Sequence, residues 1–103
     1  MINIKESDKD KFGEEIYHHK RKQGNFRWDT SVFRGSSGEY TVVFRYSFSK
    51  KNDDGVKRTL IRDEVIVKAC NVEELLSAKY PDYHDVKVFK SSSFFLKLTE
   101  RGF

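Results

Sequence analysis

The clearest pattern in the chain is a strict alternation of side chains over residues 40–48. The even-numbered positions are Tyr, Val, Phe, Tyr and Phe, whereas the odd-numbered positions between them are mostly polar. A period of two places alternate side chains on opposite faces of a β-strand, which indicates a strand with one buried face. Asp54 and Gly55 follow, and Asp-Gly favours a two-residue hairpin turn. We therefore predict a β-hairpin of residues 40–51 and 56–69.

The register of this hairpin follows from the position of the turn. Counting outward from the Asp-Gly pair sets Phe44 opposite Val65 and Arg45 opposite Glu64. The first pair is apolar and lies on one face, and the second joins opposite charges on the other face. A slip of one residue would invert one strand relative to its partner, so this agreement supports the register.

A third strand is predicted over residues 26–34, which also alternate and are separated from the hairpin by a Gly-Ser-Ser-Gly-Glu loop. Antiparallel pairing across that loop brings the apolar side chains of the two strands to the same face. On the opposite face it sets Asp29 beside Arg45. The sheet is therefore expected to carry a three-strand charge ladder of Asp29, Arg45 and Glu64.

The remaining segments predict two helices and a second hairpin. Residues 8–23 have acidic side chains in their early turns and a Lys-Arg-Lys run at their end, which suits a helix dipole, and Gly24 follows as a stop. Asn71 is a favourable N-cap with an acidic residue three positions later, so we predict a short helix over 72–80. Two apolar runs joined by three serines predict a C-terminal hairpin over 85–99.

These elements make one α+β domain over residues 1–103, with an antiparallel sheet of at least three strands. A chain of 103 residues is too short for two cores that fold without disulfides or metals. We expect the helices to cover the aromatic face of the sheet, because that face is its main apolar surface. Trp28 and Tyr46, which lie nearer the edge, are the expected exceptions to this burial.

The composition of the chain limits the cellular compartments in which we expect the protein. The single Cys70 excludes an internal disulfide and a four-cysteine zinc site. No apolar run approaches the ~18 residues of a membrane span. The first residues lack the basic and apolar pattern of a secretory signal, so we expect a cytoplasmic protein without a membrane partner.

No arrangement of residues predicts catalysis, a metal site or a cofactor. His18 and His19 are adjacent and would point about 100° apart on a helix, whereas two metal ligands on a helix need a spacing of four. His84 and Asp85 would face opposite sides of a strand, which does not orient a general base. Cys70 lies between a strand and a helix, where we expect a small buried residue.

Basic residues carry the main functional signal. The formal net charge is +4, and residues 20–34 hold five basic side chains and one acidic side chain. Arginine and lysine among serine and threonine, on the face opposite the aromatic one, are typical of a surface that follows phosphates. We therefore predict a small non-catalytic binding protein whose basic sheet face contacts a nucleic-acid backbone with little sequence preference. The predicted contacts, on or beside that face, are Lys20, Arg21, Lys22, Arg27, Lys51, Arg58 and Arg62.

Two alternatives stay open. The first is a protein-docking regulator or inhibitor, such as a phage-type host-interaction protein, because aromatic and arginine side chains are also enriched at protein contacts. The second is a small ribonuclease-like enzyme. The contact surface predicted for the first alternative consists of the outward-facing Phe33, Val43, Leu60 and Ile66.

Two families resemble parts of the chain. The order helix, three strands, helix over residues 8–80 resembles the double-stranded-RNA-binding domain, although residues 71–74 stand where that family has a basic pair. Residues 38–44 are similar to the Gly-x-Tyr-Arg hairpin of the small ribosome-dependent mRNA-cleaving toxins, with Thr41 in the position of their arginine. No functional residues are carried over from either family.

Overall fold

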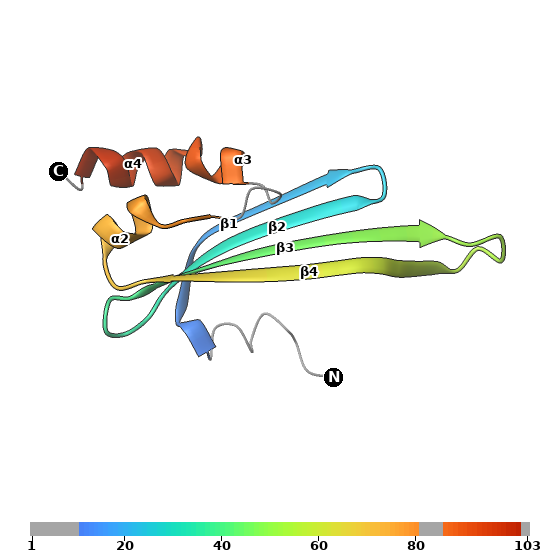
Figure 1. Cartoon of the computed structure of the whole chain (residues 1–103), viewed down its shortest axis with the longest axis horizontal. Helices are drawn as coiled ribbons and strands as arrows, with labels where there is room; N and C mark the ends of the chain where they lie inside the picture. Colours follow the sequence, from blue (N-terminus) through green and yellow to red (C-terminus); the bar gives the residue numbers. More distant parts are fainter. Residues whose placement is uncertain (1–10, 81–85, 102–103) are drawn as a thin grey trace.

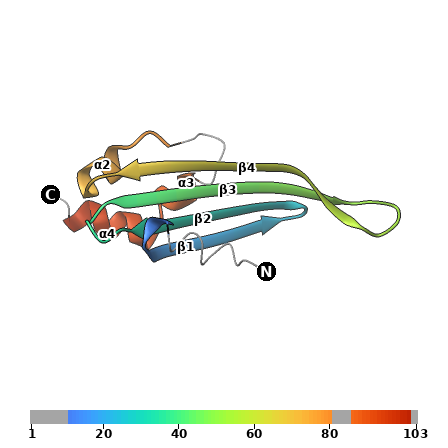
Figure 2. The same cartoon turned by 90° about the horizontal axis from the view of Figure 1, so that it is seen from below.

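The computed structural model describes residues 11–80 and 86–101, which form an antiparallel sheet with helices packed on one face (Figure 1). The strands follow one another across the sheet in chain order, β1-β2-β3-β4 (Figure 2). The predicted α+β class is confirmed. Within the described residues, no helix has the length and apolar character needed to cross a membrane. The strands are β1 (Glu14–Gln23), β2 (Phe26–Arg34), β3 (Tyr40–Lys51) and β4 (Lys57–Ala69), and the helices are α2 (Val72–Ser77), α3 (Val86–Lys90) and α4 (Ser93–Arg101).

One face of the sheet, here called the inner face, packs against the three helices. Alternation along β3 places Tyr40, Val42 and Phe44 on this face, and all three are buried. Phe89 of α3 is fully buried above them, with its ring centroid 5.8 Å from that of Phe44. Leu75 of α2 is also fully buried. The predicted burial of the aromatic face is therefore confirmed at the end of the sheet beneath the helices.

The central strands pair as the sequence predicts. Phe44 pairs with Val65, and Arg45 pairs with Glu64, across β3 and β4. Asp29 pairs with Arg45 across β2 and β3. The face turned away from the helices, here called the outer face, therefore carries these charged side chains in one row. Both predicted registers are confirmed.

The predicted helix over 8–23 is wrong, because strand β1 occupies most of that segment; residues 8–10 lie outside the described part of the chain. β1 pairs with the edge of β2, where Tyr17 lies opposite Val32. A register shift just before Tyr17 lets Ile16 and Tyr17, although adjacent, both pack against the core. A strand here also pairs backbone groups of β2 that a helix would leave unpaired. Without the first helix, the topological resemblance to the double-stranded-RNA-binding domain does not hold.

The predicted hairpin over 85–99 is also wrong, because α3 and α4 occupy this segment; residue 85 lies outside the described residues. Phe89 on α3 and Phe95 on α4 are buried with their ring centroids 5.2 Å apart. The Ser92 hydroxyl caps α4 by accepting a hydrogen bond from the Phe95 backbone N–H at 3.2 Å. Two helices bury these rings against the sheet, whereas a separate two-stranded hairpin is marginally stable in water.

The predicted short helix over 72–80 is confirmed as α2, although it ends at Ser77. Asn71 is its N-cap, and the Asn71 Oδ1 accepts a hydrogen bond from the Glu74 backbone N–H at 2.9 Å. The Glu74 carboxylate in turn accepts a hydrogen bond from the Cys70 backbone N–H at 2.6 Å. This reciprocal capping fixes the direction in which the chain leaves β4.

The tip of the β3–β4 hairpin differs from the predicted two-residue turn. The Asn52 N–H donates to the Val56 carbonyl oxygen at 3.0 Å, so these two residues face each other across the loop. The Gly55 N–H donates to the Asn52 carbonyl oxygen at 2.9 Å, and Gly55 has φ +83°, which favours glycine. The loop therefore contains three residues, 53–55, and the predicted turn at Asp54 and Gly55 is one residue too short.

A β-bulge in β4 compensates for the longer loop. Phe48 pairs with Ile61, but the next residue, Ser49, pairs with Thr59, so Leu60 is the extra residue. The hydroxyl oxygens of Ser49 and Thr59 lie 3.3 Å apart on the outer face. Between the loop and the bulge, each residue of β4 thus lies on the face opposite to the one that a regular strand would give it. Beyond the bulge, the predicted register holds.

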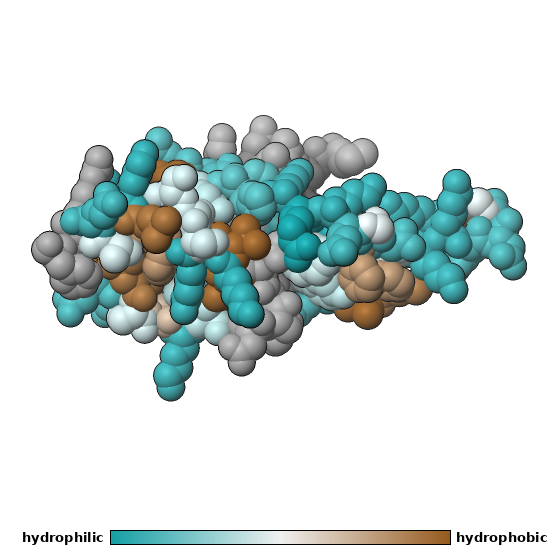
Figure 3. All heavy atoms as spheres, turned by 90° about the horizontal axis from the view of Figure 1, so that it is seen from above, coloured by the Kyte–Doolittle hydropathy of each residue, from teal (hydrophilic) through white to brown (hydrophobic). Residues whose placement is uncertain are grey.

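The helices are too short to cover the whole inner face (Figure 1). At ~1.5 Å per residue the nine-residue α4 spans about 14 Å, whereas at ~3.3 Å per residue the twelve-residue β3 spans about 40 Å. Figure 3, seen from the helix side, shows apolar side chains gathered on the sheet beyond the helices. Within the described residues, the helices therefore leave the inner face uncovered toward the β1–β2 turn and the β3–β4 tip.

Candidate nucleic-acid interface

A row that contains three basic side chains crosses all four strands on the outer face. Lys22 pairs with Arg27, Arg27 pairs with Ser47, and Ser47 pairs with Arg62. The three basic side chains are exposed, and Ser47 between them is small. These residues border an open hollow of about 600 Å³, to which Lys20 also contributes. The basic face is defined here as Lys20, Lys22, Arg27, Lys57 and Arg62.

Lys57 belongs to this face because of the bulge in β4. It pairs with Lys51 of β3, which follows Ser47 and Ser49 on the outer face. The charge of Arg27 holds the pKa of Lys57 below its ordinary value, and desolvation and the charge of Lys22 lower this pKa further. A lysine pKa lowered mainly by other cations indicates a positive local potential, which attracts anions.

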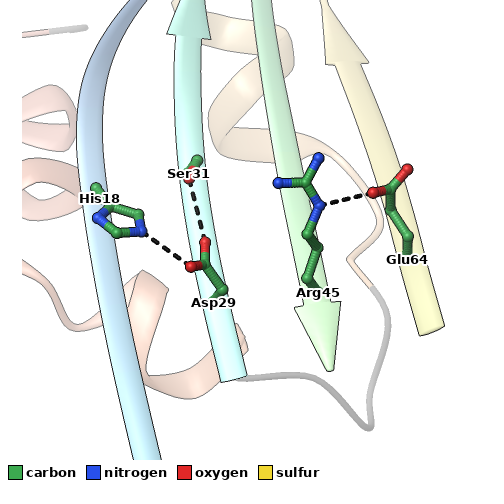
Figure 4. A network of polar contacts seen from close by, with 5 residues as sticks. All are labelled: His18, Asp29, Ser31, Arg45 and Glu64. Carbon is green, nitrogen blue, oxygen red and sulfur yellow. Dashed lines mark hydrogen bonds and ion pairs between the residues drawn. The ribbon is translucent and has the colours of Figure 1, made fainter. Parts of the chain in front are cut away.

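A polar network borders the basic face toward the centre of the sheet (Figure 4). The Arg45 Nε donates to the Glu64 Oε2 at 2.7 Å, as the predicted ladder requires. The Asp29 carboxylate accepts a hydrogen bond from the Ser31 hydroxyl at 3.3 Å and lies 3.0 Å from the His18 Nε2. The network thus includes His18 from β1 in addition to the predicted residues. The Asp29 and Glu64 carboxylates also line the outer hollow, together with Asp63, so six basic side chains outnumber three acidic ones there.

Four aromatic rings lie on the open part of the inner face. The ring centroid of Phe26 is 4.7 Å from that of Phe48 and 5.8 Å from that of Trp28, and Trp28 is 5.6 Å from Tyr46. Phe26 is 38% exposed, and the other three are partly buried. The predicted incomplete burial of Trp28 and Tyr46 is therefore confirmed. We call Phe26, Trp28, Tyr46 and Phe48 the aromatic platform.

A second hollow, of about 580 Å³, adjoins the aromatic platform at the β1–β2 turn. The guanidinium carbon of Arg21 lies 3.8 Å from the ring centroid of Trp28, which places a cation over an aromatic ring beside this hollow. Gly24 has φ +61°, and a Cβ at this position would meet no atom within 4 Å, so the turn leaves the hollow unobstructed. The hollow is lined by Gln23, Gly24, Asn25, Phe26, Trp28 and Tyr46.

The predicted nucleic-acid contacts divide between the two faces. Arg21 lies on the inner face, and Lys51 lies on the outer face near the hairpin tip. Arg58 was predicted on the outer face, which is wrong: the bulge sets it opposite Lys50, on the inner face beyond Phe48. Five of the predicted contacts line the outer hollow, namely Lys20, Arg21, Lys22, Arg27 and Arg62.

The surface predicted for protein docking is half buried. Phe33 is 3% exposed and Val43 is 1% exposed, so the expectation that they face solvent is wrong. Phe12 covers part of this area, with its ring centroid 5.6 Å from that of Phe33. Leu60 and Ile66 are exposed as predicted, at 57% and 43%. An apolar contact surface of all four residues therefore does not exist on this fold.

The candidate catalytic groups that lie within the described residues do not converge. Cys70 is exposed rather than buried, and its hydrogen bond with the Glu74 side chain and the negative charge of Glu74 raise the pKa of the thiol. A thiol with a raised pKa is a poor nucleophile at neutral pH. His84 and Asp85 lie outside the described residues. In residues 11–80 and 86–101, no group of three or more His, Cys, Asp and Glu side chains could hold a metal ion.

Sequence reasoning missed three residues of these surfaces: Lys57, Phe26 and Phe48. The signal for Lys57 lies in residues 52–55. This segment ends in glycine, so it suits a three-residue loop followed by a bulge as well as a two-residue turn, and the longer loop moves Lys57 to the outer face. The signal for the two phenylalanines is length, since the predicted helices cannot span a twelve-residue strand.

The basic face and the aromatic platform meet at the β1–β2 turn. Lys22 and Arg27 lie on the outer face there, and Phe26 of β2, opposite Gln23 of β1, lies on the inner face. One narrow end of the sheet thus presents cations on one side and aromatic rings on the other. Protein-family models, curated proteins and solved structures were compared with this chain, and none matches it.

Proposed function

We propose that the protein binds the phosphate backbone of nucleic acids with little sequence preference, through the basic face. The observation that carries the proposal is the convergence of Lys22, Arg27 and Arg62, from three strands, around one open hollow of the outer face, with Lys57 close enough for Arg27 and Lys22 to lower its pKa. Repulsion among these cations costs stability in the free protein, and a polyanion relieves it. The lowered pKa of Lys57 supports this view.

The chemistry of these side chains suits phosphates rather than base edges. Lysine and arginine donate only, and on an open sheet face their long side chains can follow a backbone whose charges repeat regularly. Contacts to phosphates position a protein without reading sequence. Binding through about four phosphates should therefore be weak, fast and strongly dependent on salt.

The geometry favours this function over the two alternatives. The protein-docking surface loses Phe33 and Val43 to burial, which leaves Leu60 and Ile66 as separate exposed side chains. For the ribonuclease-like alternative, Glu64 is already paired with Arg45, and Cys70 has a raised thiol pKa. Neither alternative gains support from the described residues.

The direct test is a fluorescence-polarisation titration of labelled oligonucleotides of mixed sequence. For about four phosphate contacts, affinity should fall roughly fifty- to a hundred-and-fifty-fold between about 50 and 200 mM salt. Unrelated sequences should bind alike at each salt concentration. No binding at the lower salt concentration would disprove the proposal.

Charge reversals locate the binding surface. Arg27→Glu and Arg62→Glu should each lower affinity at low salt and reduce the slope of log affinity against log salt. Lys97→Glu is the matched control, because Lys97 is an exposed lysine on α4, on the helix side of the molecule. Equal losses from all three reversals would show that net charge, and not the basic face, determines binding.

A further inference from the structure

We infer that the aromatic platform stacks unpaired bases, so that the ligand of this protein is a single-stranded nucleic acid. This inference rests on the proposed function and narrows its ligand class. The described helices leave the platform uncovered, and Phe26 is 38% exposed at the rim of the 580 Å³ hollow. Large exposed aromatic surface is costly in water, which indicates a binding role for such a patch.

The rings are arranged as a stacking surface. The ring planes of Phe26 and Trp28 are inclined by 20° and those of Phe26 and Tyr46 by 27°, whereas the Phe26–Phe48 and Trp28–Tyr46 pairs are tilted by 41° and 47°. In a packed core, edge-to-face pairs are common, as between Phe44 and Phe89 at 83° in this protein. The platform instead offers several partly exposed rings side by side on an open sheet, and every base has a π-face that can stack on such a ring.

Charge around the platform identifies the occupant. Arg21 lies over Trp28, and alternation along the hairpin places Lys50 and Arg58 on the same face beyond Phe48. Asp63, opposite Tyr46, is an acidic residue on this part of the face, and these three cations outnumber it. An apolar protein segment would gain nothing from these cations. A chain that carries planar rings and regular negative charge is complementary to both features.

The hollow at the β1–β2 turn suits an unpaired base and not a duplex. In a duplex each base is stacked on its neighbours, and only base edges are accessible in the grooves. An unpaired base can enter with its face against Phe26. The side chains of Gln23 and Asn25 line the same hollow and carry amide groups that can hydrogen-bond a base edge.

Trp28 makes the test direct, because it is the single tryptophan of the chain. Stacking of a base beside it should quench its fluorescence. We expect saturable quenching by an unstructured twelve-nucleotide oligothymidylate, and by the corresponding oligouridylate if the strand is RNA. A DNA hairpin with a fully paired stem and the same number of phosphates should bind at least tenfold more weakly and leave the emission nearly unchanged.

Ring variants test whether stacking contributes to affinity. Phe26→Ala should weaken single-strand binding on the order of tenfold without changing affinity for the hairpin. Phe26→Tyr keeps a ring and should retain the affinity. Leu96→Ala is the matched control, because Leu96 is 51% exposed on α4 and away from the platform. Far-UV circular dichroism of each variant verifies that the sheet is intact.

The outcomes separate this inference from the proposed function. Salt-dependent polarisation binding without Trp28 quenching would overturn the stacking inference and leave backbone binding in place. Quenching that is insensitive both to salt and to Arg27→Glu would support stacking and overturn the basic face. Absence of any binding to either oligonucleotide would overturn both, and would then favour a protein occupant for the platform.

Discussion

Arg27 on β2 lowers the pKa of Lys57 on β4, although β3 lies between these strands. The interaction requires both side chains on the outer face of the sheet. A regular two-residue hairpin would place Lys57 on the inner face and Arg58 on the outer one. The three-residue loop and the bulge at Leu60 exchange them. A backbone irregularity therefore determines which cation joins the basic face.

Reversing the charge of Lys57 should stabilise the protein at low salt, because Lys57→Glu replaces repulsion from Arg27 with attraction. The urea midpoint should rise at about 10 mM salt, and the gain should shrink at about 0.5 M, where exposed charges are screened. In the wild type, the lowered pKa means that the cost of repulsion is present while Lys57 is protonated. That cost is fully present below the lowered pKa, and it declines as pH rises from the lowered pKa to the ordinary lysine value.

A double-mutant cycle gives this prediction its control. The gain from Lys57→Glu should be lost in combination with Arg27→Glu. Arg58→Glu, one residue further along the same strand, should show no such coupling to Arg27. Equal coupling at both positions would mean that the bulge does not separate the two side chains.

The central strands were predictable because two independent signals agree there. Alternation marks the apolar face, and the charge pair of Arg45 and Glu64 checks the same register on the other face. The loop was predicted one residue too short, yet the register was right, because the extra residue at Leu60 restores it. Counting residue pairs outward from the turn cannot predict this compensation, because it assumes that neither strand contains an extra residue.

Phe89→Ala should destabilise the protein by about 3–5 kcal/mol, the usual cost of removing a buried aromatic ring. Phe89 has no exposed surface, and its ring contacts those of Tyr17, Phe44 and Phe95. Urea unfolding followed by circular dichroism measures the change. Since the free energy of unfolding of a small domain is only about 5–15 kcal/mol, the variant should be partly unfolded at 37 °C.

Leu96→Ala in α4 is the control for this prediction. Leu96 is 51% exposed, so its replacement should change stability by less than about 0.5 kcal/mol. A similar small effect of Phe89→Ala would show that α3 does not pack on the sheet. The two substitutions together test the C-terminal helices, which the sequence pattern did not predict.

The elements predicted near both ends of the chain are wrong, because the local sequence pattern there favours one secondary structure and tertiary packing favours another. The charge gradient before Gly24 suits a helix, but the edge of β2 needs a partner strand, and β1 buries Ile16 and Tyr17 in that position. The apolar runs after residue 85 resemble strands. They form helices because this conformation buries Phe89 and Phe95 against the inner face of the sheet, and this tertiary packing overrides the local preference.

Gly13→Ala should cost more than about 2 kcal/mol, because two penalties add at this position. Gly13 has φ +99°, and a Cβ there would lie 2.3 Å from the Arg34 carbonyl oxygen, which is backbone and cannot move aside. Gly24→Ala, with φ +61° and nothing within 4 Å, should cost only the backbone strain of about 1–2 kcal/mol. Chemical denaturation of the two variants compares them directly.

Losses of similar size at the two glycines would show that the close approach of β1 to Arg34 is absent. Gly24→Ala is expected to retain the fold, because the turn that contains Gly24 is exposed. The comparison therefore tests the entry into β1, the strand whose existence the sequence pattern failed to indicate.

The surfaces of the candidate site were only partly predictable. The part of the basic row formed by Arg27 and Arg62 follows from alternation and register, which are visible in the sequence, whereas Lys22 joins the row through β1, which the sequence pattern did not predict. The open aromatic platform depends on where the helices end on the inner face. That position is set by three-dimensional packing of Phe89 and Leu75, which no periodicity encodes.

Tyr80 should ionise only near pH 12, because burial raises the pKa of its hydroxyl to about 12. This hydroxyl donates a hydrogen bond to the Leu75 carbonyl oxygen, and the ring stacks edge-on against Phe44 at 76°. In the unfolded chain a tyrosine ionises near pH ~10. The difference absorbance titration of wild type minus Tyr80→Phe should therefore show one tyrosinate with a midpoint close to pH 12.

The same shift sets the alkaline limit of stability. Because the pKa of Tyr80 is raised in the folded state, its contribution is fully present below the unfolded pKa and is lost as pH rises through the folded value. The free energy of unfolding should thus decline between about pH 10 and pH 12. In Tyr80→Phe this part of the decline should be absent, whereas an unchanged slope would place the Tyr80 ring in solvent and α2 away from the sheet.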